Sequence, residues 1–211
     1  TGEPAENWYD DFELEDGIYA EETVINYNQD AVDIDDPSSQ QGNFGANSGQ
    51  TSAHLEDRIP GIPGFALAPT DNIAAEITAF LELEQGLYTM GVNSDDGFIV
   101  DCGVALADAL ALRLGEFNDG RGAADTIFLF EVLEAGIYPF RLVWWEGDGG
   151  ANVEWFTVAE DGTKILINDG DESASVKAYR EGPSLPYIAS ISPAPDSSNA
   201  RPDTAISIVL Q

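Results

Sequence analysis

Two adjacent aspartates, Asp95 and Asp96, stand between two apolar runs in the stretch VNSDDGFIVDCG, residues 92–103. Carboxylate oxygens are ligands for hard cations such as calcium. In an extended trans strand, however, neighbouring side chains point to opposite faces, so two adjacent carboxylates cannot easily hold one ion. A polar turn, with an aspartate at its start and Gly97 at positive φ, is the alternative that needs no ion.

A second stretch, EGDGGAN at residues 146–152, combines glycines with oxygen-bearing side chains. Calcium takes about six to eight oxygen ligands, more than two aspartates supply. Glycines let backbone carbonyls approach an ion closely. Taken alone, the stretch is typical of a flexible hairpin loop. If it forms a site, its candidate metal ligands are Glu146, Asp148 and Asn152. Its candidate contacts to a bound ligand are Gly149, Gly150 and Asn152.

The elements around these residues are expected to be strands. Apolar and polar residues alternate in NIAAEITAFLEL (72–83), and TIFLFEVLEAGIYPFRLVWWEG (126–147) predicts two strands joined at residues 134–136. ANVEWFTVAEDGTKILIND (151–169) predicts a hairpin with an Asp161-Gly162 turn. Several short strands separated by turn signals predict an all-β, antiparallel sandwich or barrel. The helix-forming residues of VALADALALRLGEF (104–117) allow either a helical turn or an irregular crossing between sheets.

The chain is expected to have three parts. Residues 1–60 are acidic and loop-rich, with 23–27 as their best short strand, and residues 61–182 form the sandwich. Residues 183–211 read as a proline-rich linker followed by one strand, which carries Ile206, Ile208 and Leu210 on one face. A solitary strand is not stable alone, so this strand either begins a further domain or pairs with a sheet edge of another subunit. We expect the numbering to start after a processed leader or inside a longer protein.

Composition excludes several classes of function. The 211 residues include 39 acidic and 8 basic ones, a formal net charge of -31 (8 minus 39). Nucleic acids and anionic membranes require clustered Lys and Arg, so neither is an expected partner. No apolar run approaches the about 20 residues that span a bilayer, so membrane insertion is not expected. The acidity itself favours solubility in a salty medium, cation binding by particular carboxylates, or both.

Catalysis has little support in the sequence, and we do not expect an enzyme. His54 is the only histidine and Cys102 the only cysteine, so histidine-based triads and histidine metal sites lack parts and no internal disulfide can form. Paired carboxylates for glycoside hydrolysis remain an alternative that no particular residue singles out.

Three segments in fixed order resemble the PA14 family of β-sandwich modules: QGLYTMGVNSDDGFIVDCG (85–103), EAGIYPFRLVWWEGDGGANVEWF (134–156) and AEDGTKILIND (159–169). In each case the strand ends and turn residues match in order and spacing. The resemblance spans roughly residues 72–179 and implies a jelly-roll sandwich. The tail ISPAPDSSNARPDT (191–204) is similar to the start of bacterial Ig-like repeats.

The resemblance also implies a site. In PA14 lectins of flocculins and adhesins, two adjacent aspartates joined by a cis peptide bind calcium, and the ion binds vicinal sugar hydroxyls. Carried over, these are Asp95 and Asp96, and the second loop at 146–152 completes the shell of the ion. Fungal lectins have an asparagine near the position of Glu146, so their sugar preference does not carry over. The implied protein is a calcium-dependent, carbohydrate-binding adhesion module of a secreted or surface-attached bacterial protein, extracellular, with a glycan as partner.

Three further residues are candidates for ligand contact. Trp145 could stack on a sugar ring, because alternation sends Trp144 and Trp145 to opposite faces and at most one of them to the core; Trp155 is expected to fill the core. Asn118 and Asp119 lie in GEFNDGRGAADT (115–126), either a third loop near the site or a solvated surface loop. The alternative function is structural: a sandwich subunit or spacer of an adhesin or fibre, assembled through the C-terminal strand at 204–210.

Overall fold

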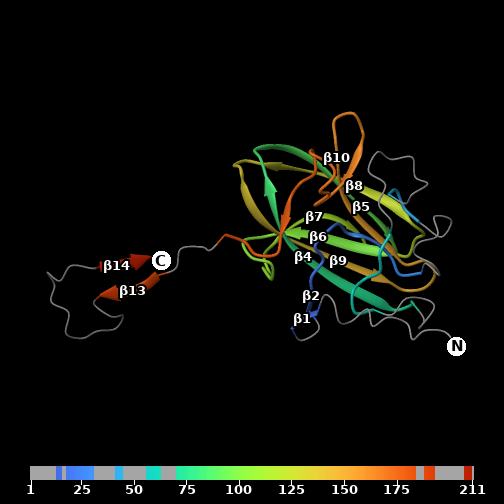
Figure 1. Ribbon diagram of the computed structural model, residues 1–211, viewed down its shortest axis with the longest axis horizontal. Coiled ribbons are helices and arrows are strands. Elements are labelled where there is room, and N and C mark those ends of the chain that lie inside the picture. The colour runs from blue at the N-terminus through green and yellow to red at the C-terminus, as the bar shows by residue number, and fades with distance from the viewer. Residues whose placement is uncertain are drawn as a thin grey trace.

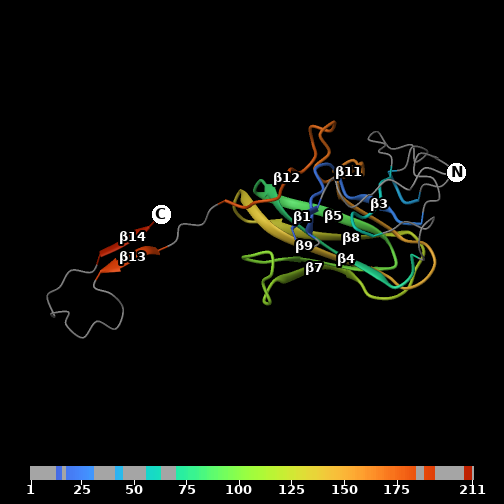
Figure 2. The ribbon, with the colours of Figure 1, turned by 60° about the horizontal axis from the view of Figure 1, so that its bottom comes forward.

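The computed structural model describes residues 13–15, 18–30, 41–44, 56–62, 70–183, 188–192 and 207–210. Within these ranges the fold is an all-β sandwich of two five-stranded antiparallel sheets, as the sequence predicts (Figure 1). The long strands of both sheets run in roughly the same direction (Figure 2), the usual arrangement of an aligned sandwich. No helix long and apolar enough to cross a membrane occurs among the described residues.

The first sheet runs in the order β11-β10-β5-β8, and β3 also pairs with β10. Its strands are β3 (Asn26–Asn28), β5 (Gly86–Asp95), β8 (Ala124–Val132), β10 (Asn152–Val158) and β11 (Lys164–Leu166). The second sheet runs in the order β12-β4-β9-β6-β7. Its strands are β4 (Ile73–Leu83), β6 (Gly97–Cys102), β7 (Leu112–Phe117), β9 (Gly136–Glu146) and β12 (Ala178–Tyr179).

The core lies between the inward faces of the two sheets. Along β9, Phe140, Leu142 and Trp144 alternate inward, because successive strand residues point to opposite faces. They meet Trp155 of β10, whose indole N–H donates to the Met90 sulfur of β5 at 3.2 Å. Trp144 and Trp155 are thus core residues while Trp145 faces outward, in agreement with the alternation in the sequence.

Residues before position 61 contribute to the sandwich that the sequence assigned to 61–182. β3 pairs with β10 from Asn28 opposite Asn152 to Asn26 opposite Glu154, close to the strand expected at 23–27. On the outer face of the first sheet, the buried ring of Phe44 packs against Phe156 with centroids 5.6 Å apart. The remaining expectations for the acidic segment, His54 among them, fall outside the described residues.

Residues 104–117 form turns followed by β7, which pairs with β6 in the same sheet, so both expectations, a helical turn and a crossing between sheets, are wrong. Asp108 explains the turns, because its carboxylate accepts the backbone N–H groups of Val104 at 3.0 Å and Leu110 at 2.8 Å. Aspartate side chains commonly bond nearby backbone in this way and so compete with helix formation. From Leu112 onward the chain pairs with β6.

Two short hairpins complete the described chain: β1 (Glu13–Glu15) with β2 (Ile18–Tyr19), and β13 (Ile188–Ser192) with β14 (Ser207–Leu210). The sequence predicts one strand after residue 183, whereas the structure has two. The short apolar run of β13 stands between Pro186 and Pro193, which made it read as part of the linker. β14 therefore has a partner strand within the chain.

Candidate metal centre

Three loops cross from one sheet to the other at the same end of the sandwich. Asp96 alone links β5 to β6, residues 118–123 link β7 to β8, and residues 147–151 link β9 to β10. Asp95 is the last residue of β5 and Glu146 the last of β9, so the ends of two strands bring distant carboxylates together. The convergence follows from the order in which the strands alternate between sheets.

Asp95, Asp96 and Glu146 form a buried carboxylate cluster, with exposed fractions of 6%, 8% and 2%. One oxygen from each lies within 4.8 Å of the others. Calcium–oxygen distances are 2.3–2.6 Å, so two oxygens on one calcium ion stand at most about 5 Å apart. The spacing of the cluster therefore fits a single shared ion.

The peptide bond between Asp95 and Asp96 is cis, as the resemblance implies. Both oxygens of Asp96 accept backbone N–H groups, from Arg121 at 2.7 Å and from Gly147 at 2.9 Å. Gly97 does not adopt positive φ but begins β6, and a Cβ there would stand 2.2 Å from the Trp145 indole. The polar turn with Gly97 at positive φ is therefore wrong, and the glycine instead makes room for Trp145.

Glu146 lacks hydrogen-bond partners among the described residues: both of its buried carboxylate oxygens are unsatisfied. Asn152 is buried as well; its amide donates to Asn93 Oδ1 at 3.0 Å, while its own Oδ1 accepts nothing from the described residues. Burying an unpaired carboxylate is costly, and a bound cation is one of the few partners that can offset this cost. These orphaned oxygens are of the chemical type that calcium takes.

The cluster also has shifted titration behaviour. Burial, and then the charge of Asp96, raises the pKa of Asp95 to about 6. Burial, followed by the charges of Asp96 and Asp95, raises the pKa of Glu146 to about 8. Like charges in a partly desolvated site oppose one another's ionisation, and a cation between them would reverse that effect.

A hollow of about 420 Å³ opens over the cluster. Its lining residues are Asp95, Asp96, Gly120, Arg121, Gly122, Gly147, Asp148, Gly149 and Gly150. Asp148 is exposed at the rim, and Gly149 adopts a φ of 106°. Glycines from two crossing loops thus keep side chains away from the carboxylates and leave the hollow open to solvent.

Arg121 is a residue of the site that the sequence did not single out. Its guanidinium donates to the Ser94 carbonyl at 3.0 Å and hydroxyl at 2.7 Å and to the Thr126 hydroxyl at 2.9 Å. It also lies 4.1 Å from the ring centroid of Phe117. Arg121 therefore fixes the loop whose backbone N–H orients Asp96. The only signal in the sequence is an arginine in a chain with few basic residues.

The acidic N-terminal segment also reaches the site. Gln41 Oε1 lies 3.3 Å from the position that a Cβ of Gly150 would take, and Asp30 is close enough to raise the pKa of Asp95. The Gln29 N–H donates to the carbonyl of Ala151 at 2.7 Å and ties this segment to the second loop. No local pattern predicts these contacts, because they join residues that are far apart in the sequence.

The other predicted contact residues are placed differently. Trp145 lies over Gly97 and does not line the hollow. Asn118 and Asp119 are exposed in the loop between β7 and β8, which borders the hollow through residues 120–122 instead. Asn152 is buried beneath the loop.

Comparison with known proteins finds similarity at the level of structure. No family model matches the sequence, and no curated protein matches it. The structure is similar to the PA14 domain of the antifreeze protein MpAFP (17% identity, TM-score 0.42, 55% of this chain and 56% of that chain). It is also similar to a PA14 sugar-binding domain from an RTX adhesin (18% identity, TM-score 0.42, 68% of this chain and 72% of that chain).

A third similar structure is the A domain of a subtype-switched epithelial adhesin from Candida glabrata in complex with beta-lactose (14% identity, TM-score 0.38, 51% of this chain and 51% of that chain). The chain thus spans about half the length of the first and third of these structures. At low sequence identity, the structure is thus similar to PA14 domains of an antifreeze protein and of an adhesin, and to the A domain of an epithelial adhesin.

Proposed function

We propose that this chain is a calcium-dependent carbohydrate-binding module that acts in adhesion at a cell surface or outside the cell. The observation that carries the proposal is the Glu146 carboxylate, which is buried without a hydrogen-bond partner among the described residues, beside Asp95 and Asp96. A cation would stabilise the ionised form of this carboxylate, and an all-oxygen set of donors suits calcium better than softer metals.

Asp95, Asp96 and Glu146 would hold the ion, with Asn152 Oδ1 and the carbonyls of the 147–151 loop as further oxygen donors. When bound, calcium supplies coordination positions that vicinal sugar hydroxyls can take from water. The protein's part is to keep the carboxylates aligned through the Arg121 and Gly147 N–H groups, and to leave the glycine-lined hollow open for a sugar ring. Asp148, which is exposed at the rim, would accept a hydrogen bond from a sugar hydroxyl.

The test has two stages. First, calcium should raise the melting temperature of the wild-type protein, and Asp96→Asn and Glu146→Gln should respond much less. An unchanged wild-type melting temperature, or an equal rise in both variants, would rule out the metal site. Second, a glycan array should show binding with calcium that is lost with a chelator. Calcium binding without any glycan binding would leave a structural ion and contradict the carbohydrate part.

Assembly through the C-terminal strand is the weaker alternative, because β14 pairs with β13 in the same chain. Removal of the residues after Pro183 should leave the calcium response of the sandwich intact. A truncated chain that loses both its calcium response and its oligomeric state would favour the structural function instead.

A further inference from the structure

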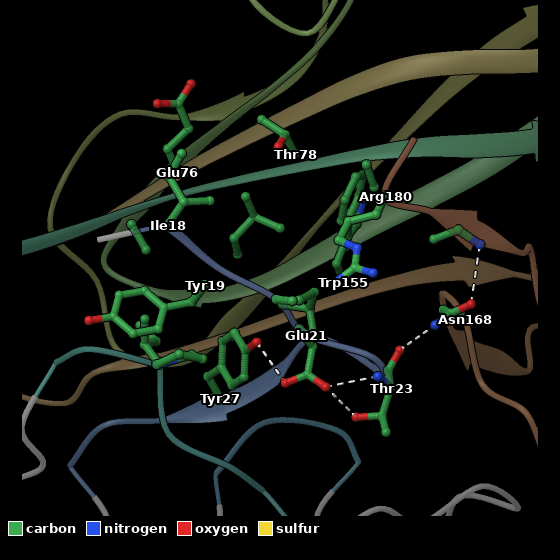
Figure 3. A pocket seen from close by; sticks show the side chains of 18 of the residues that line it. Ile18, Tyr19, Glu21, Thr23, Tyr27, Glu76, Thr78, Trp155, Asn168 and Arg180 are labelled. Atoms are coloured by element: carbon green, nitrogen blue, oxygen red, sulfur yellow. Dashed lines mark hydrogen bonds between the residues drawn. The ribbon is translucent and has the colours of Figure 1, made fainter. Parts of the chain in front are cut away.

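A second and larger hollow lies on another side of the sandwich, away from the carboxylate cluster. It is a groove of about 1070 Å³ between β4 and the N-terminal residues 18–27 and 59–62 (Figure 3). Trp155 and Tyr27 lie at its floor, with Ile25, Ile59 and Ile77 around them. None of the residues that line this groove also lines the hollow over the carboxylates.

One wall of the groove is a strand edge that has no partner over most of its length among the described residues. β9 pairs with one edge of β4 from Ile73 to Leu83. On the other edge, β12 pairs only opposite Phe80 and Leu81. Residues 74–79 all line the groove, and their free edge continues the line that β12 occupies. An unpaired edge presents backbone donors and acceptors to any extended chain that can reach it.

Alternation determines which β4 groups face this open edge. In an antiparallel ladder, successive residues direct their N–H and C=O groups to opposite sides. The Glu82 N–H donates to the Lys177 carbonyl beside β12 at 3.0 Å, so residues 74, 76 and 78 also direct their backbone groups away from β9. A second hydrogen bond leads to the same assignment. The Trp145 carbonyl accepts the Asp96 N–H, so odd-numbered residues of β9 direct their backbone groups toward β6. The even-numbered residues of β9 then bond to β4, where they stand opposite odd-numbered residues.

The side chains of β4 alternate in the same way. Ala75, Ile77 and Ala79 pack against the core, whereas Glu76 and Thr78 are exposed. A strand added to this edge would alternate likewise and place every second side chain in the groove over Trp155 and Tyr27. Apolar residues at those positions would bury surface on both partners, and the intervening residues would stay in solvent beside Glu76.

We propose that the β4 edge binds an extended segment of another protein by β-strand addition, as a strand beside residues 74–79. The segment is apolar at every second position and carries lysine or arginine between. The charge follows from the rim, where Glu21 and Glu181 line the groove with Arg180 as the single basic lining residue, and from the strongly acidic chain as a whole; Glu76 is already paired with Arg141. A second copy of this chain is opposed by its own net charge of -31 at low salt.

The test uses a synthetic peptide of about eight residues, in which valine alternates with threonine and lysine. Binding is followed by fluorescence anisotropy and by amide hydrogen exchange of residues 74–79. Two further peptides carry N-methyl groups, one at the odd and one at the even positions. Only one parity can donate to β4, so one N-methylated peptide should lose about tenfold or more in affinity and the other should bind like the parent. Loss with both, or with neither, would overturn strand addition.

Two variants of the protein complete the design. Thr78→Pro removes an N–H that faces the open edge without removing a bond to β9, and it should weaken binding about tenfold. Thr78→Val keeps that N–H and should bind like the wild type. A chelator should leave peptide binding unchanged. Failure of the calcium proposal can therefore be distinguished from failure of strand addition at the β4 edge. No peptide binding, equal binding of both variants, or dimerisation of the wild type that Thr78→Pro abolishes would each overturn the proposal.

Discussion

Gly150 lies directly against Asp95: a Cβ atom built on the glycine would stand 2.5 Å from Oδ2 of the aspartate. The glycine belongs to the loop between β9 and β10 and the aspartate to the end of β5, so this contact is where the second loop closes over the first. The loop can approach the carboxylate only because position 150 has no side chain.

Gly150→Ala should therefore weaken calcium binding about tenfold, because the added methyl group displaces the Asp95 carboxylate from its place in the cluster. The carboxylate is the end of a flexible side chain and can move, so the melting temperature without calcium should change little. Gly122→Ala is the matched control, since this residue also lines the hollow but a Cβ there would meet nothing within 4 Å. Isothermal titration with calcium decides; equal affinities for the two variants would contradict the predicted contact.

The metal-free protein should become less stable as the pH rises. The pKa of Asp95 is raised from 3.8 to about 6 and that of Glu146 from 4.5 to about 8. A carboxyl whose pKa is raised on folding contributes stability that is complete below the unfolded pKa and is lost as the pH rises through the folded pKa. In a chelator, the melting temperature should thus fall between about pH 4.5 and pH 8.

Burial also raises the pKa of Glu154, to about 7, so part of this fall has another origin. Two comparisons isolate the cluster: saturating calcium and the Glu146→Gln variant should each make the decline shallower. Glu160→Gln, at an exposed position, should leave it unchanged. A decline equally steep with calcium, with chelator and in Glu146→Gln would show that the cluster is not its source.

Arg121→Met should destabilise the fold by about 2 kcal/mol and weaken calcium binding, because the guanidinium holds Ser94 and Thr126 and lies over the Phe117 ring. Chemical denaturation measures the first effect and calcium titration the second. Arg113→Met is the comparison: this partly exposed arginine pairs with the exposed Glu116 and with the buried Asp101, which Arg141 also approaches at 3.9 Å, so its loss should cost about 1 kcal/mol or less. If both variants behave alike, Arg121 does not position the site.

Phe44→Ala should cost about 3 kcal/mol of unfolding free energy, since the ring is buried and packs on Phe156. Leu129→Ala removes a side chain that is 62% exposed and should cost less than about 0.5 kcal/mol. Urea denaturation of both variants compares the two sites. A small effect at Phe44 would mean that the N-terminal segment covers the first sheet without stabilising it.

Local patterns predict most of the strands. The alternation of apolar and polar residues in 72–83 and 126–147 predicts β4, β8 and β9. It also predicts that Trp144 and Trp145 point to opposite faces of the sheet. Both properties depend on neighbouring residues alone. The pairing of Asp95 and Asp96 with Glu146 came from a resemblance between ordered segments, and the structure brings these three carboxylates together. Arg121, Gln41 and the groove beside β4 depend on contacts between remote segments and leave no local periodicity. The helical alternative for residues 104–117 failed because the Asp108 carboxylate binds backbone N–H groups that a helix would use.

The three crossing loops have a mechanical consequence. At this end the chain passes between the two sheets through Asp96, residues 118–123 and residues 147–151, which all border the carboxylate cluster, and also through the longer connection from β3 to β4. Tension that pulls one sheet from the other at this end is therefore transmitted through the backbone around the cluster.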